Sequence, residues 1–396
     1  MKEKLWKKTG RKIMAKTQIG EPLFHIAKRG NLPLWKAIVI RGGAIVGAIL
    51  FSAILCAIMF KASPFEIIRS LFNGILGTER RIWLLIRDTA LLLGVGLALL
   101  PAFKMKFWNL GGNGQILMGA LVTVAIMRSS IGENSPAIAN ILMLIGSIVI
   151  GAIWAVIPAI FKAFFKTNES LFTLMMNYIA SGIVAYFLSV WSVNGTGVLG
   201  QVKTGHLPEI ANAHLLTILV VAVLTALMHV YMKHCKQGYE ISVVGESENT
   251  AKYIGINVKK VIIRTLAISG AICGIIGLLL AGAIDHSINE QTANNMGFTA
   301  IMVAWLAKFN PLIMILSSLL IAFLTRGMGQ VQTDFGIFND AIANLVVGIV
   351  YFIVIGCEFF ISYQIKFKKI KKSTSGSTPN GESVSKKDET GVKEGE

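Results

Sequence analysis

Charged residues are scarce in this chain of 396 residues: 15% are Asp, Glu, Lys or Arg, whereas 54% are hydrophobic. A soluble domain of this length needs far more charge to cover its surface. The composition therefore excludes an ordinary soluble protein. Cysteine is rare as well, and the four cysteines show neither metal-ligand spacing nor a disulfide framework. We interpret them as small apolar packing residues.

Signatures of nucleotide binding and catalysis are also missing. No G-x-x-x-x-G-K-[ST] phosphate loop occurs, so the chain does not bind ATP in that way. The six histidines are scattered, without an H-x-x-x-H or H-E-x-x-H pair, and no G-x-S-x-G elbow is present. We therefore expect a protein that is not an enzyme and that holds no metal or cofactor of its own.

Long apolar runs are abundant. Many are long enough to cross a hydrocarbon core of about 30 Å as a helix, and helix is required because lipid offers backbone groups no hydrogen-bond partner. The sequence thus predicts an all-α, polytopic transmembrane helical bundle of about ten spans. The expected spans are residues 38–60, 82–103, 115–130, 137–161, 171–191, 214–233, 264–285, 297–307, 311–325 and 341–364. Residues 64–80 form an amphipathic exterior connector, and 297–307 with 311–325 are alternatively a broken pair.

The net charge of +17 is concentrated near the two ends of the chain and in one central loop. Basic clusters beside membrane spans stay in the cytoplasm, so we expect both termini inside and contact with anionic lipid, not binding to nucleic acid. The basic residues in 61–81 are the main exception to this rule, because the predicted topology places that connector outside the cell. The expected parts are a basic cytoplasmic segment (1–37), a transmembrane domain (38–364) with a cytoplasmic loop (234–263), and a disordered basic and polar tail (365–396).

Glycines and amides cluster between the second and third spans, in the segment FWNLGGNGQILMGA (107–120). Such residues at membrane depth suit a broken or closely packed helix whose freed backbone groups line a polar cavity. An interfacial turn with glycine packing is the alternative.

The segment TNESLFTLMMNYIA (167–180) places Glu169 at the start of a span, behind Asn168. A carboxylate within a span is a functional candidate by default. Near a helix N-terminus it also interacts favourably with the helix dipole, and we favour this second interpretation. Arg87 and Asp88 lie inside a span too, where an interior pair, a pathway role and snorkelling to the exterior are all open.

The most informative stretch is GYEISVVGESENTAKYIGINVKK (238–260), a polar interruption between two apolar segments. Gly245 and Gly255 bracket a block long enough for about two helical turns. The basic residues put this loop in the cytoplasm, where it is exposed to other proteins.

Together with GFTAIMVAWLAKFNP (297–311), these three blocks resemble the ordered motifs of bacterial ABC-importer permeases for nucleosides and simple sugars. The resemblance runs from about residue 80 to about residue 360 and is nearer to the nucleoside (guanosine-type) branch than to the ribose branch. Two positions depart from the family pattern. Asn113 stands where Glu is usual, and Ser247–Tyr253 replaces a run that usually carries Asn-Pro before Ala-Ala-Arg-Tyr.

The resemblance implies an integral subunit in a bacterial plasma membrane. It would pair with a second permease subunit, be driven by cytosolic ABC ATP-binding subunits that hold the ATP and Mg²⁺, and receive its small-molecule substrate from an extracellular substrate-binding lipoprotein. It also implies a coupling segment for the ATP-binding subunit. The matching positions are Gly238, Glu240, Gly245, Glu246, Ala251, Tyr253 and Gly255.

For the implied substrate path, we expect polar and aromatic contacts suited to a nucleoside. The candidates are Asn109, Gly111, Gly112, Asn113, Gln115, Glu169, Asn177, Tyr178 and Phe298. A simple sugar or riboflavin on the same machinery is one alternative. An ion-coupled secondary transporter that uses Asp88 or Glu169 is another.

Overall fold

The structure is a computed structural model that describes residues 24–28, 34–192, 197–209, 212–336 and 340–367. Contacts divide the chain into two units, residues 39–357 and residues 1–38 with 358–396. In the second of these, β1 (Phe24–Lys28) pairs antiparallel with β2 (Tyr363–Phe367), and Phe24 lies opposite Phe367. Strand β2 thus covers the first three residues of the predicted tail. The rest of that tail and most of the predicted N-terminal segment lie outside the described residues.

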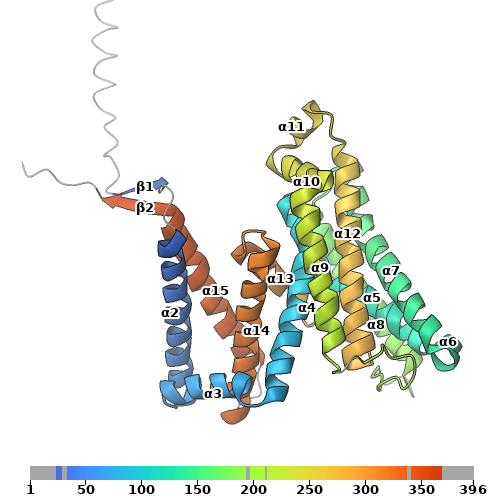
Figure 1. Cartoon of the computed structure of the whole chain (residues 1–396), viewed down its shortest axis with the longest axis horizontal. Coiled ribbons are helices and arrows are strands. Elements are labelled where there is room, and N and C mark those ends of the chain that lie inside the picture. Colours follow the sequence, from blue (N-terminus) through green and yellow to red (C-terminus); the bar gives the residue numbers. More distant parts are fainter. Residues whose placement is uncertain (1–23, 29–33, 193–196, 210–211, 337–339, 368–396) are drawn as a thin grey trace, which may run out of the picture. The chain divides into compact units, whose positions relative to one another are not determined.

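The larger unit is helical (Figure 1). Its helices are α2 (Leu34–Phe60, which starts in the small unit), α3 (Pro64–Leu76), α4 (Glu79–Lys104), α5 (Gly112–Met127), α6 (Ser130–Asn134), α7 (Pro136–Phe165), α8 (Glu169–Trp191), α9 (Leu215–His234), α10 (Lys236–Glu246), α11 (Glu248–Tyr253), α12 (Val258–Leu279), α13 (Met296–Leu306), α14 (Pro311–Asp334) and α15 (Asp340–Ser362). A π-helical turn, η2 (Leu280–Asp285), extends α12.

Seven helices within the described ranges are long and apolar enough to cross a membrane, and three shorter apolar helices accompany them. Each of the ten predicted spans lies over one of these helices, which confirms an all-α membrane bundle. Helices α13 and α14 are separate, with Lys308 and Phe309 between them in left-handed backbone conformations. The predicted exterior connector is helix α3, which buries Ile67 and Leu71 and exposes Phe65.

Polar residues fix the helix boundaries. The side chains of Asn168 and Asn257 accept hydrogen bonds from the backbone N–H groups of Leu171 and Lys260, so α8 and α12 begin behind them. Asn310 does the same for α14, whose first residue is a proline. These caps explain why α12 starts at Val258, six residues before the predicted span.

Helix α5 is the most enclosed helix of the large unit and packs against α7, α8 and α12. Small residues allow this proximity: a Cβ on Gly119 would lie 2.7 Å from the Gly274 Cα of α12. A Cβ on Gly270 would likewise meet the Gly151 carbonyl of α7. Close backbone approach through glycine is the usual way for helices to associate in lipid.

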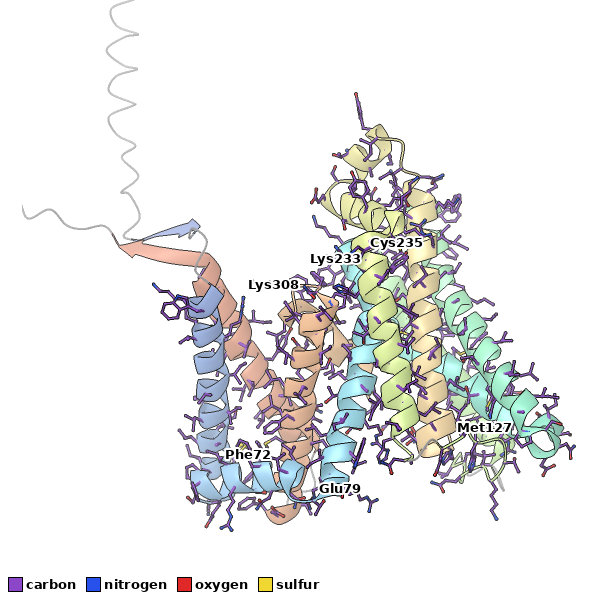
Figure 2. The ribbon with its side chains drawn as sticks, in the orientation of Figure 1. Phe72, Glu79, Met127, Lys233, Cys235 and Lys308 are labelled. Atoms are coloured by element: carbon purple, nitrogen blue, oxygen red, sulfur yellow. The ribbon has the colours of Figure 1, made fainter. Side chains whose placement is uncertain are left out.

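The two ends of the large unit differ in their residues. Lys233, Cys235 and Lys308 lie at the end that carries α10 and α11, and Glu79 and Met127 lie at the other end (Figure 2). The predicted cytoplasmic connectors therefore share one end of the bundle, as the charge pattern requires.

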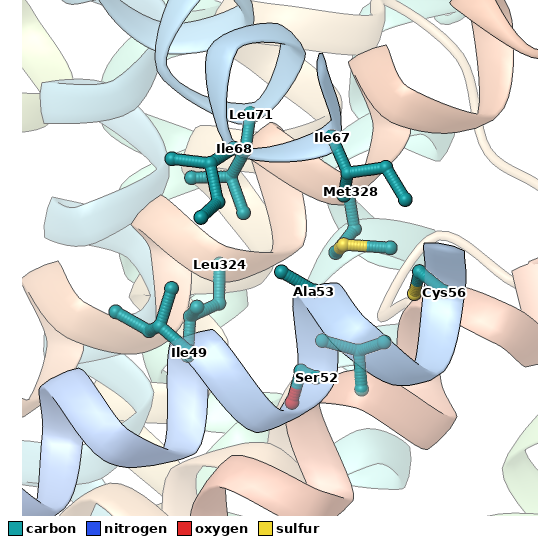
Figure 3. Close-up of a pocket in the computed structure, with 10 residues that line it drawn as sticks. Ile49, Ser52, Ala53, Cys56, Ile67, Ile68, Leu71, Leu324 and Met328 are labelled. Atoms are coloured by element: carbon teal, nitrogen blue, oxygen red, sulfur yellow. The ribbon is translucent and has the colours of Figure 1, made fainter. Parts of the chain in front are cut away.

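A small apolar cavity lies between α2, α3, α14 and α15, bordered by Ile49, Ile67, Leu324 and neighbouring residues (Figure 3). Its volume is about 10 Å³, enough for one water molecule at most. The Ser52 hydroxyl faces this region buried and without a hydrogen-bond partner. The cavity is too small to hold an organic substrate.

Candidate functional site

Helix α10 is seated against the ends of two long helices. One residue separates it from α9, and a Cβ on Gly238 would lie 2.5 Å from the carbonyl oxygen of Tyr231. At the other end of α10, Gly245 packs so closely against the carbonyl oxygen of Lys104, the last residue of α4, that a Cβ would not fit. Gly238 and Gly245 of the predicted coupling segment are therefore required by close backbone contact.

Helix α10 is also tied to α12. The Arg264 guanidinium of α12 donates to the Glu240 carboxylate at 2.8 Å, and both side chains are largely buried. Ile241 and Val244 add apolar contacts on the same side of α10. Glu240 thus faces the bundle, not the solvent.

Helix α11 projects beyond α10 (Figure 1) and has the opposite character. Ser247 caps it by accepting from the Thr250 N–H, and Ala251 is its one buried residue. The Tyr253 side chain is 96% exposed. Gly255 follows with φ of 83°, a left-handed conformation that favours glycine and ends the helix. The block therefore presents an aromatic ring on a short, capped helix.

A cleft of about 230 Å³ lies between this segment and the neighbouring helix ends. Its walls include Lys106, Glu246 and Glu248, and an ion pair between Lys162 and Glu169 at 2.6 Å. Glu169 is thus paired at the α10–α11 end of the bundle. It also lies in the first turn of α8, which supports the capping and dipole interpretation.

The glycine- and amide-rich segment forms the break between α4 and α5. Asn109 is fully buried and donates to the Ser269 hydroxyl of α12 at 3.2 Å. Its side-chain oxygen accepts from the Gly111 N–H at 3.1 Å and from the Gln115 side chain at 3.2 Å. Asn109 thereby stabilises a chain reversal that has no helical hydrogen bonds of its own.

Two further amides join this break to neighbouring helices. The Asn113 side chain accepts from the Gly297 N–H of α13, and the Asn177 side chain of α8 accepts from the Gly114 N–H and donates to the Leu110 carbonyl, all at 2.8 Å. A Cβ placed on Gly112 would lie 3.3 Å from the Cα of Gly297. In this structure the amides and glycines act as the packed turn that the sequence left as an alternative.

The two aromatic path candidates are not part of this cluster of hydrogen bonds. The Tyr178 side chain is 72% exposed on the outer face of α8, and Phe298 is half-buried on α13. The structure therefore groups Asn109, Asn113 and Asn177 around one helix break and leaves Tyr178 on a separate surface.

Arg87 and Asp88 form an interior pair that the sequence left undecided. Asp88 accepts from Arg87 at 3.0 Å and from the Arg326 Nε of α14 at 2.5 Å, so one carboxylate serves two guanidiniums. Nearby, burial and then the positive charge of Arg87 lower the pKa of His214, which precedes α9. This cluster links α4 to α14.

Sequence reasoning missed the basic partners of the acidic residues. Arg264, Lys162 and Arg326 each neutralise a carboxylate from another helix. The available signal was a basic residue within or at the edge of an apolar run. Nothing in the sequence says which acid it meets, because each pair forms between two different helices whose packing the sequence does not specify. Over the described ranges, no group of three His, Cys, Asp or Glu side chains has the geometry to hold a metal ion.

The family of permease components of branched-chain amino acid transport systems matches residues 83–355. The chain belongs to this family. It is accordingly a multi-pass permease subunit of an ABC transport system in the plasma membrane, which confirms the family and localisation expected from the sequence.

Several curated relatives are similar over most of their length. The chain is 28% identical to a guanosine ABC transporter permease of Bacillus subtilis, covering 76% of this chain and 88% of the relative. It is 25% identical to a nucleoside ABC transporter permease of Lactococcus lactis, covering 85% and 96%. A glucose ABC transporter permease of Haloferax volcanii is 28% identical, covering 71% and 77%. No solved structure matches the chain.

Proposed function

We propose that this permease carries nucleosides into the cell as one half of an ABC importer, with energy supplied through α10 and α11. The observation that supports coupling most directly is the contrast within this segment. Helix α10 is fixed to α4, α9 and α12, whereas α11 exposes Tyr253. A short helix fixed on one side and open on the other transmits the movement of a partner as a rigid-body push.

The proposed partners follow from this arrangement. A cytosolic ATP-binding subunit, which holds the ATP and Mg²⁺, contacts α11. A second permease subunit, identical or related, completes the membrane path, and an extracellular substrate-binding lipoprotein delivers the substrate. The chain itself contributes no catalytic residue, metal or cofactor.

The nucleoside assignment is supported by the names of the two relatives with the broadest coverage given above. A simple sugar is the second candidate substrate, because one relative is a glucose permease. Riboflavin is the third, because a probable riboflavin import permease of Treponema pallidum is 21% identical to the chain. In this proposal the buried amides around the α4–α5 break contact the substrate only after that turn opens.

An ion-coupled secondary transporter is disfavoured by the ion pairs. Such a transporter needs a carboxylate that is free to bind the coupling ion. Asp88 is shared by two guanidiniums and Glu169 is paired with Lys162, so both candidate carboxylates are already occupied by basic side chains of the chain itself.

The test is uptake of labelled guanosine, glucose and riboflavin into proteoliposomes that contain the purified permease with its second permease subunit and the ATP-binding subunit, in the presence of the substrate-binding lipoprotein. We expect ATP-dependent guanosine uptake, and loss of ATP-binding subunit association in a Tyr253→Asp variant. Phe65→Asp is the matched control, because Phe65 is also exposed but lies on α3. Uptake that persists without ATP and collapses with an uncoupler would contradict the proposal.

A further inference from the structure

Among the described residues, the ion pair between Glu240 and Arg264 is the one charged contact on the bundle side of α10. The contacts made by Gly238 and Gly245 are backbone packing against α9 and α4. Packing of this kind holds α10 against its neighbours but includes no directional charged contact. The ion pair adds one between α10 and α12, so it is suited to carry movement from α10 into the bundle.

The pair lies in a partly buried position. The Glu240 and Arg264 side chains are 16% and 24% exposed, and the Arg264 Nε is buried without an acceptor. The Tyr231 hydroxyl of α9 is also buried and lies close to the same guanidinium. In such a partly buried position, removal of one charge leaves the other unpaired, which costs more than the loss of a surface ion pair.

Helix α12 extends this contact to the opposite end of the bundle. Between Arg264 and the end of η2 the helix rises through about 30 Å, packed along α5 and α7. At its far end, the Gly282 and His286 carbonyls accept hydrogen bonds from Leu207 and Val202 of the preceding loop. Movement of Arg264 along the helix axis would therefore reach the loop at the far end.

We propose that Arg264 is a positioning residue that, through Glu240, keeps α10 and α12 moving together, so that substrate movement stays in step with ATP hydrolysis. This proposal rests on the proposed function, because it assumes that an ATP-binding subunit acts on α11. Glu246 and Glu248 are exposed and line the cleft beside Lys106, so they are available to the partner instead.

The experiment compares Glu240→Gln, Arg264→Gln and the reversed pair Glu240→Arg with Arg264→Glu in proteoliposomes. For each, three quantities are measured: association with the ATP-binding subunit, ATP hydrolysis, and guanosine uptake per ATP hydrolysed. Glu290→Gln is the matched control, because it removes an exposed carboxylate from a loop. We expect the single variants to keep association and hydrolysis but to lose about tenfold in uptake per ATP, within the usual range of coupling between linked sites. The reversed pair should recover much of that loss.

Two results would overturn the inference. One is wild-type uptake per ATP in both single variants. The other is loss of association in parallel with uptake, which would place the pair in the docking surface. A wild-type chain that fails to associate with the ATP-binding subunit would instead refute the proposed function.

A second construction covers the case in which the single variants do not fold. Cysteines replace Glu240 and Arg264 in a Cys235→Ser background, since Cys235 is the exposed native cysteine of the described side chains. A short, reducible bifunctional thiol reagent then bridges them. We expect low uptake per ATP before bridging and recovery after it. Inhibition by the bridge, reversed on reduction, would show that α10 must move relative to α12 and would overturn the inference.

Discussion

Asn177 and Tyr178 are adjacent residues of α8 with opposite surroundings. The Asn177 side chain bonds to two backbone groups of the α4–α5 break, whereas the Tyr178 side chain is mostly exposed. The sequence placed both in a substrate path because polar and aromatic groups within a span are functional candidates. Residue type alone cannot distinguish an amide that holds a turn from one that meets a ligand, because both uses need the same hydrogen bonds.

We predict that Asn177→Ala lowers the free energy of unfolding by about 1–3 kcal/mol for each backbone group left unpaired. The reason is that the Leu110 carbonyl and the Gly114 N–H would lose their partner. Thermal unfolding of the purified permease in detergent measures this. Tyr178→Phe is the control and should leave stability unchanged. Equal stability of both variants would show that the Asn177 bonds contribute nothing.

At the scale of elements, α4 and α14 are joined by an asymmetric charge cluster. Arg87 and Arg326 share Asp88, so the two kinds of charge removal differ in effect. Without Arg87, Asp88 and Arg326 remain a neutral pair. Without Asp88, two guanidiniums face each other unpaired in a partly buried position.

We therefore predict that Asp88→Asn destabilises the protein by about 2 kcal/mol, less than the cost of opening a fully buried pair because these side chains retain some solvent contact. Arg87→Gln should cost clearly less. Chemical or thermal unfolding of the two variants side by side checks the order. A larger loss for Arg87→Gln would contradict the shared-carboxylate arrangement.

A second contact between elements lies in the turn after η2, where His286 meets the loop that contains His206. The His286 ring stacks on His206 with 4.0 Å between centroids, and its backbone is left-handed with φ of 50°. Burial, then the neighbouring His206, lower the pKa of His286 from its ordinary value of 6.5, although the Gly282 carbonyl and Glu209 act in the opposite direction.

A lowered pKa means that the folded state binds the proton less readily than the unfolded chain does. The contact is therefore at full strength above pH 6.5 and weakens as the pH falls below that value toward the lowered pKa. We predict faster hydrogen exchange in residues 197–207 at pH 5 than at pH 7.5, after correction for intrinsic rates. His286→Asn should remove most of this pH dependence. An unchanged dependence in that variant would assign the effect to other groups.

For the whole molecule, the apolar runs were sufficient to place each predicted span over a helix of the structure. Lipid leaves the backbone no alternative to helix, so run length determines the element directly. Tertiary partners such as Arg326 for Asp88, or Gly297 for Asn113, were not predictable. They depend on which helices become neighbours, and the periodicity of a single helix carries no information about that.

The charge pattern also predicts an orientation, with α10, α11 and both termini in the cytoplasm. We predict that a membrane-impermeant maleimide labels Cys235 in inverted vesicles and not in intact cells. Cys56, Cys273 and Cys357 are buried, so they give little background. A Glu290→Cys variant in a Cys235→Ser background should show the reverse pattern. Labelling of Cys235 from outside would invert the predicted topology.

The division of the coupling segment into an embedded helix and a projecting one has an evolutionary consequence. The residues that fix α10 to the bundle face inward, while α11 offers its partner only one short turn of surface around Tyr253. On the proposed function, a few surface substitutions would suffice to transfer this permease from one ATP-binding subunit to another without repacking the membrane core. A duplicated permease with a binding protein of its own would then share an existing motor.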